Sequence, residues 1–437
     1  MKNSGIQNAI EPKIIPRPSH NVSRAEISKS ALKVLYRLHG AGFQAFLVGG
    51  SVRDALLGLH PKDFDIATDA HPEELKALFG NCRLIGRRFR LAHIRFGREI
   101  IEVATFRAAA GDAGDPDVAH DDEGRILRDN LYGKIEEDVW RRDFSCNALY
   151  YNIADFSIWD YVGGVDDIKA KRLVLIGDPH QRLREDPVRM LRAIRFAAKL
   201  DFRIDRSVAD AIAERRGLLR NVPPARLFDE FLKLFQSGHA APTFELLREH
   251  QLFEQLFPET QDHLERDDAY VRFVTSALVS TDQRVAEGKS VTPMFLLGVF
   301  LWAPVQSFAE HLRTSEEMSE AEALGIAAQE ISARQLARIA IPRRFTAPMR
   351  DMLALQPRFA NRHGRRALKF LEHRRFRAAY DFMMLRSEAG DIDQETADFW
   401  TGVQKESADQ RLTSFDLPSG GKGRRRPPRR RRKAQGS

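Results

Sequence analysis

The 437-residue sequence lacks long apolar runs and has almost no cysteine, and each absence excludes a class of protein. Its longest apolar stretch, Met294–Ala303, is too short to cross a bilayer, because a membrane-spanning helix needs about 20 apolar residues. Two cysteines, Cys82 and Cys146, rule out a disulfide framework or a CxxC zinc site. The N-terminus has no charged start followed by an apolar stretch, so we expect no secretory signal. These absences favour a cytoplasmic protein.

Charge is abundant but unevenly distributed. Hydrophobic residues make up 43% of the chain and charged residues 30%, which is typical of a globular protein, and the length allows two to four domains. The net charge is +8, yet Lys422–Lys433 alone carries nine basic residues and no acidic one. Arg343–Arg377 adds eleven basic residues against two acidic ones. This distribution indicates a nearly neutral reaction centre joined to a surface that binds a polyanion.

The segment Leu47–Thr68 reads LVGGSVRDALLGLHPKDFDIAT and is the most informative part of the chain. An apolar strand leads into Gly49 and Gly50, which form a turn where a phosphate can approach the backbone closely. Asp63 and Asp65 follow in a second strand-like segment. Because residues i and i+2 of a strand point to the same side, both carboxylates converge, and hard oxygen ligands of this kind suit Mg²⁺.

A third carboxylate follows in a predicted hairpin. Arg90–Phe96 and Glu99–Phe106 are expected to pair as strands across Gly97, with Glu102 in the second strand. Glu102 could face the aspartate pair. An exposed strand glutamate without a catalytic role is the alternative.

A polar cluster is predicted in VWRRDFSCNALYYN. The acidic residues Glu136–Asp138 mark a helix N-terminus, and Arg142, Asp143 and Asn147 would share one helical face. Arginine can hold phosphate, whereas Asp and Asn suit ribose hydroxyls and a base edge. An ordinary solvated helix face is the alternative.

REDPVRMLRAIRFAAKL, from Arg184, is the segment expected to select a base. Helical spacing places one carboxylate and three guanidinium groups in one sector, where they form donors and acceptors that can read a base edge. The alternative is an internal lattice of salt bridges. The residues of this sector are Glu185, Arg189, Arg192 and Arg195.

From Leu227 onward the pattern predicts helix after helix, with apolar stripes that form the core. Arg365–Arg377 interleaves basic residues with Phe370 and Phe376. This pattern suits either a track for single-stranded RNA or a solvated helix with core phenylalanines. Lys422–Lys433 cannot bury a core, so we expect it to be disordered and to contact RNA in a salt-sensitive way. Residues 108–130 are predicted to be a mobile loop.

These motifs together carry a family resemblance. GGSVRD, LLG and DFDIAT closely resemble the head motif of the class II nucleotidyltransferases, the family of tRNA CCA-adding enzymes and bacterial poly(A) polymerases. RRDFSCNAL is similar to the family's RRDFTxNAL motif, with Ser145 in place of threonine. DYVGGVDDIKAKRL resembles DPxGGxxDLxxxxLR and is interpreted as mainly structural. EDPVR resembles EDxxR, and RLFDEF resembles RxxxEL, in which Arg226 and Glu230 are expected to form a pair that stiffens the helix.

The resemblance implies an α+β fold with a small mixed-sheet nucleotidyltransferase head, an all-helical neck and body, and a disordered basic tail. The expected divisions are a flexible segment 1–24, a catalytic head 25–177, a neck 178–240 with the base-selecting helix, an RNA-binding body 241–410 and an Arg-rich tail 411–437.

The resemblance also implies the chemistry. The 3′-hydroxyl of an RNA would attack the α-phosphorus of a nucleoside triphosphate while Asp63 and Asp65 hold Mg²⁺. Glu102 would place the metal on the hydroxyl or accept its proton. The remaining site residues would bind the nucleotide: Gly49, Gly50, Ser51 and Arg53 at the triphosphate; Arg142, Asp143 and Asn147 at the sugar; Glu185, Asp186, Arg189, Arg192 and Arg195 at the base.

Leu84–Ile94, LIGRRFRLAHI, looks like the corresponding stretch of bacterial poly(A) polymerases, and an arginine-rich tail is common in that branch. We therefore expect ATP to be added to RNA 3′ ends without a template, which promotes RNA decay in bacteria and makes RNA-decay proteins candidate partners. A CCA-adding enzyme, which would use CTP as well as ATP, is the first alternative. A non-catalytic RNA-binding or annealing protein is the second, although it does not explain the carboxylate pair.

Overall fold

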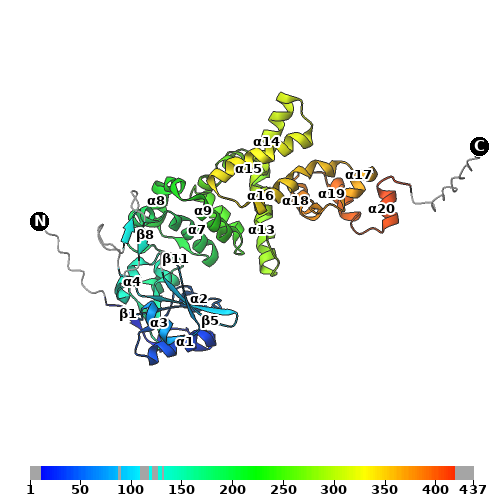
Figure 1. Ribbon diagram of the computed structural model, residues 1–437. Coiled ribbons are helices and arrows are strands. Elements are labelled where there is room, and N and C mark those ends of the chain that lie inside the picture. Colours follow the sequence, from blue (N-terminus) through cyan, green and yellow to red (C-terminus); the bar gives the residue numbers. More distant parts are fainter. Residues whose placement is uncertain (1–10, 87–89, 109–117, 121–125, 130–131, 419–437) are drawn as a thin grey trace, which may run out of the picture. The chain divides into compact units, whose positions relative to one another are not determined.

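The computed structural model describes residues 11–86, 90–108, 118–120, 126–129 and 132–418 (Figure 1). The chain divides into two compact units. The first contains the residues up to Phe235 together with Pro242–Leu256, and the second contains Gln236–Ala241 and the residues from Phe257 onward. The first unit combines a mixed sheet with helices and the second is helical, so the predicted α+β class is confirmed. The predicted disordered tail 411–437 begins too early, because its residues 411–414 belong to the capped helix α20 (Ala408–Ser414). Residues 419–437, which include Lys422–Lys433, lie outside the described residues.

The first unit is built on a sheet whose strand order is β1-β10-β9-β2-β3-β6-β5-β4. Neighbours pair antiparallel except β3 and β6, which are parallel. The register sets Val48 opposite Asp65 and Asp65 opposite Glu102. The end of β2, the start of β3 and the middle of β6 are therefore adjacent. The strands are β1 Lys13–Ile15, β2 Ala45–Val48, β3 Asp65–Thr68, β4 Cys82–Ile85, β5 Leu91–Phe96, β6 Glu99–Thr105, β9 Leu149–Asn152 and β10 Ile158–Asp160.

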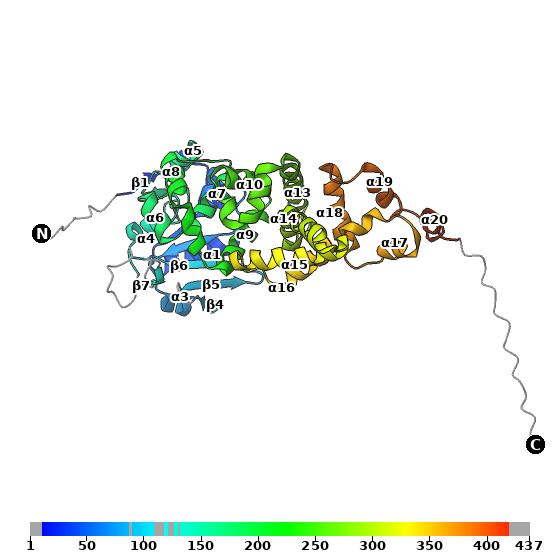
Figure 2. The ribbon, with the colours of Figure 1, turned by 90° about the horizontal axis from the view of Figure 1, so that it is seen from above.

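The central strand β2, with the sequence AFLV, is buried along its whole length, as expected for a strand covered on both faces. Phe46 and Val48 share a core cluster with Ile135 and Val139, which come from a helix of this unit. Figure 2 shows α3 beside β4 and β5, against which it packs. The helices are α1 Lys29–Gly40, α2 Gly50–Leu56, α3 Pro72–Leu78, α4 Ile135–Arg141, α5 Gly164–Lys169, α6 Pro179–Glu185, α7 Val188–Leu200, α8 Arg206–Arg215, α9 Pro224–Phe235, α10 Ala240–Glu249 and α11 Phe253–Leu256.

Two segments predicted to be unstructured contain strands. Lys13–Ile15, within the predicted flexible segment 1–24, pairs with the edge strand β10, because pairing satisfies edge backbone groups that would otherwise stay open. Residues 108–130 include an antiparallel pair, and the rest of that stretch from 109 lies outside the described residues. Short strands of this kind give weak periodicity in a sequence. The remaining strands are β7 Val118–His120, β8 Ile126–Asp129, β11 Arg172–Leu173 and β12 Arg203–Ile204.

The second unit is a stack of helices around α14, which packs against α12, α13, α15 and α16. By length and composition, α14 is the one helix of the described chain that could span a membrane, but 61% of its apolar window is buried inside the protein. Its apolar side chains therefore form the core of this unit. The helices are α12 Pro258–Arg266, α13 Asp268–Ala286, α14 Pro293–Glu316, α15 Glu320–Arg338, α16 Arg343–Ala354, α17 Gly364–Phe370, α18 Phe376–Glu388, α19 Gln394–Gly402 and α20 Ala408–Ser414.

Candidate active site

A glycine bend at the C-terminal end of the central strand β2 joins this strand to α2. Gly49 has φ 72° and ψ −136°, a conformation that only glycine adopts readily, and it caps α2, which begins at Gly50. The predicted turn is therefore present. Ser51, however, donates its hydroxyl hydrogen bond to Val48 O at 3.1 Å, so this hydroxyl already has a partner inside the bend.

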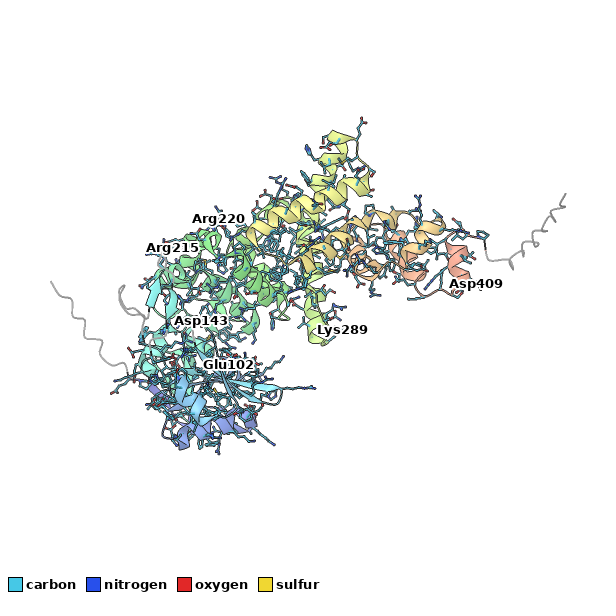
Figure 3. All side chains as sticks on the ribbon, viewed as in Figure 1. Glu102, Asp143, Arg215, Arg220, Lys289 and Asp409 are labelled. Carbon is cyan, nitrogen blue, oxygen red and sulfur yellow. The ribbon has the colours of Figure 1, made fainter. Side chains whose placement is uncertain are left out.

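The predicted carboxylates gather beside this bend. Oδ2 of Asp65 lies 3.9 Å from the position that a Cβ on Gly49 would occupy. Asp63 precedes the strand rather than lying in it, but buried Phe64 separates two exposed aspartates, as the alternation predicts. Glu102 lies opposite Asp65 on β6 and is one of the residues labelled in Figure 3. The structure thus brings the bend, the aspartates and Glu102 together.

The electrostatics of Asp65 reflect this crowding, and its pKa is raised to about 6. Loss of water around the carboxylate is the largest cause of the raised pKa. The residue as a whole is exposed, but its carboxylate lies against the bend. The negative charges of Glu102 and Asp63 raise the pKa further, whereas Arg142 lowers it. Several carboxylates that disfavour one another's ionisation are suited to a cation.

The donor set fits magnesium. Among the described residues, no three His, Cys, Asp or Glu side chains are arranged to hold a metal ion by themselves. Mg²⁺ is commonly bound through one or two carboxylates together with substrate phosphates, so it does not require such a cage. Asp63 and Asp65 would supply that number of ligands beside a bend that a phosphate can approach.

The sequence analysis missed His93. Its Nε2 lies 3.2 Å from Oε1 of Glu102, because β5 and β6 pair antiparallel with these residues opposite each other. The sequence predicts both hairpin strands, and counting outward from a two-residue turn at Gly97 and Arg98 pairs His93 with Glu102.

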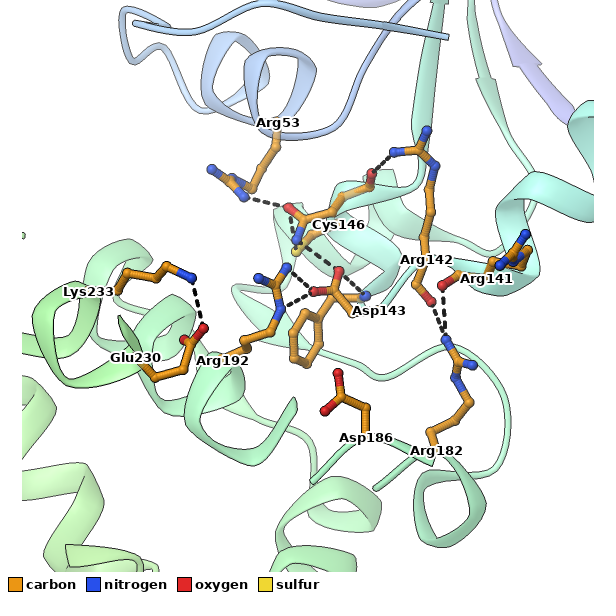
Figure 4. Close-up of polar contacts among 12 residues, drawn as sticks. Arg53, Arg141, Arg142, Asp143, Cys146, Arg182, Asp186, Arg192, Glu230 and Lys233 are labelled. Atoms are coloured by element: carbon orange, nitrogen blue, oxygen red, sulfur yellow. Dashed lines mark hydrogen bonds and ion pairs between the residues drawn. The ribbon is translucent and has the colours of Figure 1, made fainter. Parts of the chain in front are cut away.

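The predicted phosphate ligand Arg53 is buried and fully engaged. Its Nε and Nη2 donate to Asp54 Oδ1 at 2.8 and 2.6 Å, and its Nη1 donates to Asn147 Oδ1. Nη2 also lies 3.3 Å from the position of a Cβ on Gly50. Arg53 therefore lies under the bend and links it to the segment containing Asn147 (Figure 4).

The prediction of one helical face for Arg142, Asp143 and Asn147 is wrong. The helix α4 ends at Arg141, and Arg142 is extended with ψ 161°. A 3₁₀ turn, η3 (Ser145–Asn147), then returns the chain, so that Asn147 Nδ2 still donates to Asp143 Oδ1 at 3.3 Å. The cluster exists, but a turn forms it.

Asp143 accepts hydrogen bonds from Arg192, which lies in the segment expected to select the base. Nε of Arg192 donates to Asp143 Oδ2 at 2.8 Å, and Nη2 of Arg192 donates to the same oxygen (Figure 4). Burial alone would raise the pKa of Asp143, but the charge and hydrogen bonds of Arg192 hold it below the usual value. Asp143 is thus an ionised acceptor.

The segment from Arg184 that is expected to select the base is not one helix. Glu185 ends α6, while Pro187 precedes α7, because proline disfavours helical geometry in the preceding residue and removes one donor. Glu185 and Arg189 nevertheless meet, with Nη1 of Arg189 donating to Glu185 Oε2 at 3.0 Å. Arg182 donates to the same oxygen at 2.7 Å. The structure therefore contains the salt-bridge lattice that was the alternative interpretation.

Three guanidinium groups surround the ring of Phe196. The Cζ atoms of Arg195, Arg53 and Arg192 lie 4.7, 5.3 and 5.4 Å from its centroid. Burial and the charge of Arg192 lower the pKa of Arg195, whose Nε has no hydrogen-bond partner among the described residues. This positive cluster suits an anion or a carbonyl-bearing base.

The predicted pair between Arg226 and Glu230 is also wrong. Nη2 of Arg226 donates to Asp186 Oδ2 at 2.7 Å, and Lys233 donates to Glu230 Oε1 at 2.8 Å. Asp186 lies in the break between α6 and α7 and is therefore free to reach α9. Helical spacing alone could not reveal this longer-range partner.

The DYVGG element has structural contacts, in agreement with its interpretation. Asp160 accepts hydrogen bonds from the backbone N–H groups of Gly164 and Val165, both at 2.9 Å. Asp167 accepts one from the Ser145 hydroxyl at 2.6 Å. A hydroxyl at position 145 is thus used to brace the turn that carries Asn147.

In the second unit, Phe370 and Phe376 are buried. The interpretation of these residues as core phenylalanines is therefore confirmed. Arg365, Arg366 and Lys369 are exposed on α17. Their use as an RNA track stays a prediction.

Family models and curated proteins match this chain. Residues 45–174 match the family described as "Poly A polymerase head domain", residues 201–264 match "Probable RNA and SrmB- binding site of polymerase A", and residues 316–434 match "Polymerase A arginine-rich C-terminus". Poly(A) polymerase I of Salmonella typhi is 45% identical over 427 residues, covering 96% of this chain and 92% of that protein. The Haemophilus influenzae protein of the same name is 45% identical, covering 94% and 92%.

CCA-adding enzymes are less similar. That of Lactobacillus helveticus is 36% identical over 226 residues, or 52% of this chain and 54% of that protein. Two solved structures share the fold. The Bacillus stearothermophilus CCA-adding enzyme in complex with CTP has a TM-score of 0.53 at 23% identity, covering 88% of this chain and 90% of that one. The Thermotoga maritima enzyme complexed with tRNA has a TM-score of 0.56 at 19% identity, covering 92% and 89%.

Proposed function

The chain belongs to the bacterial poly(A) polymerase family of nucleotidyltransferases, and from this premise we propose that its reaction centre is the bend at Gly49 with the carboxylates beside it. The protein is a template-independent polynucleotide adenylyltransferase that adds AMP from ATP to RNA 3′ ends. The observation that carries the proposed site is the register of the sheet, which sets Asp65 beside both the end of β2 and Glu102.

In the proposed reaction, the RNA 3′-hydroxyl attacks the α-phosphorus of ATP and pyrophosphate leaves. Asp63 and Asp65 would hold Mg²⁺, which would supply positive charge for the attacking and leaving oxygens. The backbone at Gly49 lets the triphosphate approach, and Arg142 lies beside it as a cationic partner. Glu102, on the strand next to Asp65, orients the hydroxyl or accepts its proton.

We further propose that the arginines around Phe196 contact the base. Arg192 and Arg195 present donors to carbonyl or ring nitrogen atoms, and the pair of Glu185 and Arg189 presents both an acceptor and donors. In this arrangement the salt-bridge lattice and the base template are the same side chains. ATP binding would then exchange some internal ion pairs for contacts with adenine.

RNA is the substrate class supported by the match of residues 201–264 to an RNA-binding region of polymerase A. We propose that the protein acts in the cytoplasm on mRNA and other RNAs, and that RNA-decay proteins are its partners. The excess of basic residues at Arg343–Arg377 and Lys422–Lys433 supports contact with RNA phosphates.

The test of the site is the replacement of each aspartate. Asp63→Asn and Asp65→Asn keep the side-chain size but remove the charge that binds Mg²⁺, so labelled ATP should no longer be incorporated into RNA. Asp210→Asn, at an exposed position on α8, is the matched control and should keep full activity. Retained activity in Asp65→Asn would refute the metal assignment.

The first alternative, CCA addition, is tested with nucleotide and RNA choice. Purified protein is incubated with labelled ATP or CTP and with either an unstructured RNA or a tRNA that lacks its 3′ end. Long products from ATP on the unstructured RNA support polyadenylation. Short products that require CTP and the tRNA would contradict it.

A further inference from the structure

Arg142 is a basic side chain that borders both the glycine bend and the carboxylates. Its Nη1 lies 3.9 Å from the position of a Cβ on Gly49, and Oδ2 of Asp65 lies 3.9 Å from the same position. Its charge also lowers the pKa of Asp65. The orientation of this guanidinium matters, because the group can bind a phosphate at the bend or instead neutralise the carboxylate that is proposed to hold the metal.

Two buried side chains fix that orientation. Arg142 Nε donates to Tyr150 Oη at 2.8 Å, while Nε and Nη2 donate to Asp138 Oδ2 at 3.2 and 3.0 Å. Tyr150 in turn donates its hydroxyl hydrogen to Asp138 Oδ2 at 2.7 Å. The three side chains therefore form a closed triangle, and the guanidinium also lies 4.9 Å from the Tyr150 ring centroid. Tyr150 is fully buried and Asp138 nearly so.

The triangle leaves one nitrogen of the guanidinium, Nη1, for a ligand. Within the described residues, the only hydrogen bond of Arg142 Nη1 is a long one, 3.5 Å, to Asn147 O. Nε and Nη2 face the protein, whereas Nη1 is the atom nearest Gly49. A buried, hydrogen-bonded guanidinium has little rotamer freedom left to lose on binding, so a phosphate at the bend meets a preorganised donor.

The phenol is suited to this position because it both accepts and donates. Burial raises the pKa of Tyr150 well above that of a free tyrosine, and Asp138 raises it further, although Arg142 opposes both. The hydroxyl is therefore protonated at neutral pH. A phenylalanine would fill the same space but could do neither, leaving Arg142 Nε and the Asp138 carboxylate one partner short.

We propose that Tyr150 and Asp138 are positioning residues that hold Arg142 with its Nη1 directed at the triphosphate of the incoming nucleotide. The proposal rests on the function proposed above. It assigns to two core residues a role in binding the nucleotide, through Arg142 rather than by contact with the substrate.

The test compares two neighbouring tyrosines on β9. Tyr150→Phe removes the hydroxyl of the triangle, whereas Tyr151→Phe removes a buried hydroxyl that has no hydrogen-bond partner in the described part of the chain. We expect Tyr150→Phe to raise KM for ATP and the Kd for ATP about tenfold, as the loss of one hydrogen bond to a charged group predicts, with a smaller effect on kcat. Tyr151→Phe should change neither constant. Equal effects of the two changes, or no effect of Tyr150→Phe, would overturn the proposal.

A double-mutant cycle identifies the route of the effect. Calorimetric titration with ATP gives binding constants that do not depend on turnover, for Tyr150→Phe, Arg142→Lys and the combination. Lysine cannot form the forked hydrogen bonds of a guanidinium. In the Arg142→Lys background, Tyr150→Phe should therefore raise the Kd for ATP less than twofold. A full tenfold loss in the Arg142→Lys background would mean that Tyr150 acts by another route. Inactivity of Asp65→Asn combined with a silent Tyr150→Phe would refute this inference alone and leave the proposed function standing.

Discussion

At the scale of single residues, Gly49 decides whether the bend can exist. Its φ of 72° and ψ of −136° bring β2 into α2 at the point where Asp65 and Arg142 approach. A Cβ would have room, since both nearest atoms are 3.9 Å away. The constraint is therefore the backbone conformation rather than crowding.

We expect Gly49→Ala to destabilise the protein by about 1–3 kcal/mol, because a side chain strains this backbone conformation. Relaxation of the strain would also move the bend and reduce activity. Gly80→Ala is the matched control, since Gly80 lies at a position of ordinary φ with no atom within 4 Å of the added Cβ. Urea unfolding of both variants measures the difference. Equal stability of the two would show that the bend tolerates a side chain.

The pKa of Asp65 gives a second prediction at this scale. Aspartate titrates near 3.9 in an unfolded chain and at about 6 here, so the folded protein binds more protons than the unfolded chain between about pH 4 and 6. The contribution of Asp65 to the free energy of unfolding therefore falls as the pH rises through this window. Above it the carboxylate is ionised and Mg²⁺ can offset the repulsion. We expect Mg²⁺ to raise the Tm more at about pH 7.5 than at about pH 5.

Thermal unfolding with and without Mg²⁺ measures this effect. Asp65→Asn should lose most of the Mg²⁺-dependent rise in Tm, whereas Asp210→Asn should keep it. A rise that is independent of pH in the unmodified protein would mean that the metal binds elsewhere.

At the scale of elements, the sequence predicts the features that depend on contacts between residues close together in the chain. The apolar strand before Gly49, the alternation around Phe64 and the hairpin across Gly97 all depend on neighbouring residues. The sequence could not predict the partner of Arg226, because Asp186 is 40 residues away and a break in the helix frees it. The sequence also does not predict that α4 ends before Arg142, because acidic residues mark where a helix begins and not where it ends.

Arg182 of α6 donates hydrogen bonds to the C-terminal end of α4, and its replacement tests what these bonds contribute to stability. From α6, its Nη2 donates to the carbonyl oxygens of Arg141 and Arg142 at 3.1 and 2.8 Å, where α4 ends. Arg182→Met should destabilise the protein by about 1–3 kcal/mol, because these half-buried carbonyls lose their donor. Arg184→Met, at an exposed position of α6, should change stability by less than about 0.5 kcal/mol. Denaturant unfolding compares them, and equal losses would contradict the capping role.

At the scale of the whole molecule, the distribution of charge governs contact with RNA. Nine basic residues lie in Lys422–Lys433, outside the described structure, while the rest of the chain is nearly neutral. A sequence-independent contact with phosphates releases counterions, so its strength falls steeply with salt. An enzyme that acts on mRNA and other RNAs, as proposed above, would need affinity of this kind.

We therefore expect a chain that ends at Pro418 to bind single-stranded RNA with a weaker dependence on salt. If all nine basic residues contact phosphates, their removal should reduce the magnitude of the slope of log K against log salt by about 6. Replacement of the exposed Arg365, Arg366 and Lys369 of α17 by Gln should reduce that magnitude by about 2. Fluorescence anisotropy over a salt series measures both slopes, with an unchanged Tm as the control for folding. Because the carboxylates and the bend are untouched, kcat at saturating RNA should stay close to that of the full chain. An unchanged slope after removal of residues 419–437 would show that Lys422–Lys433 does not contact RNA.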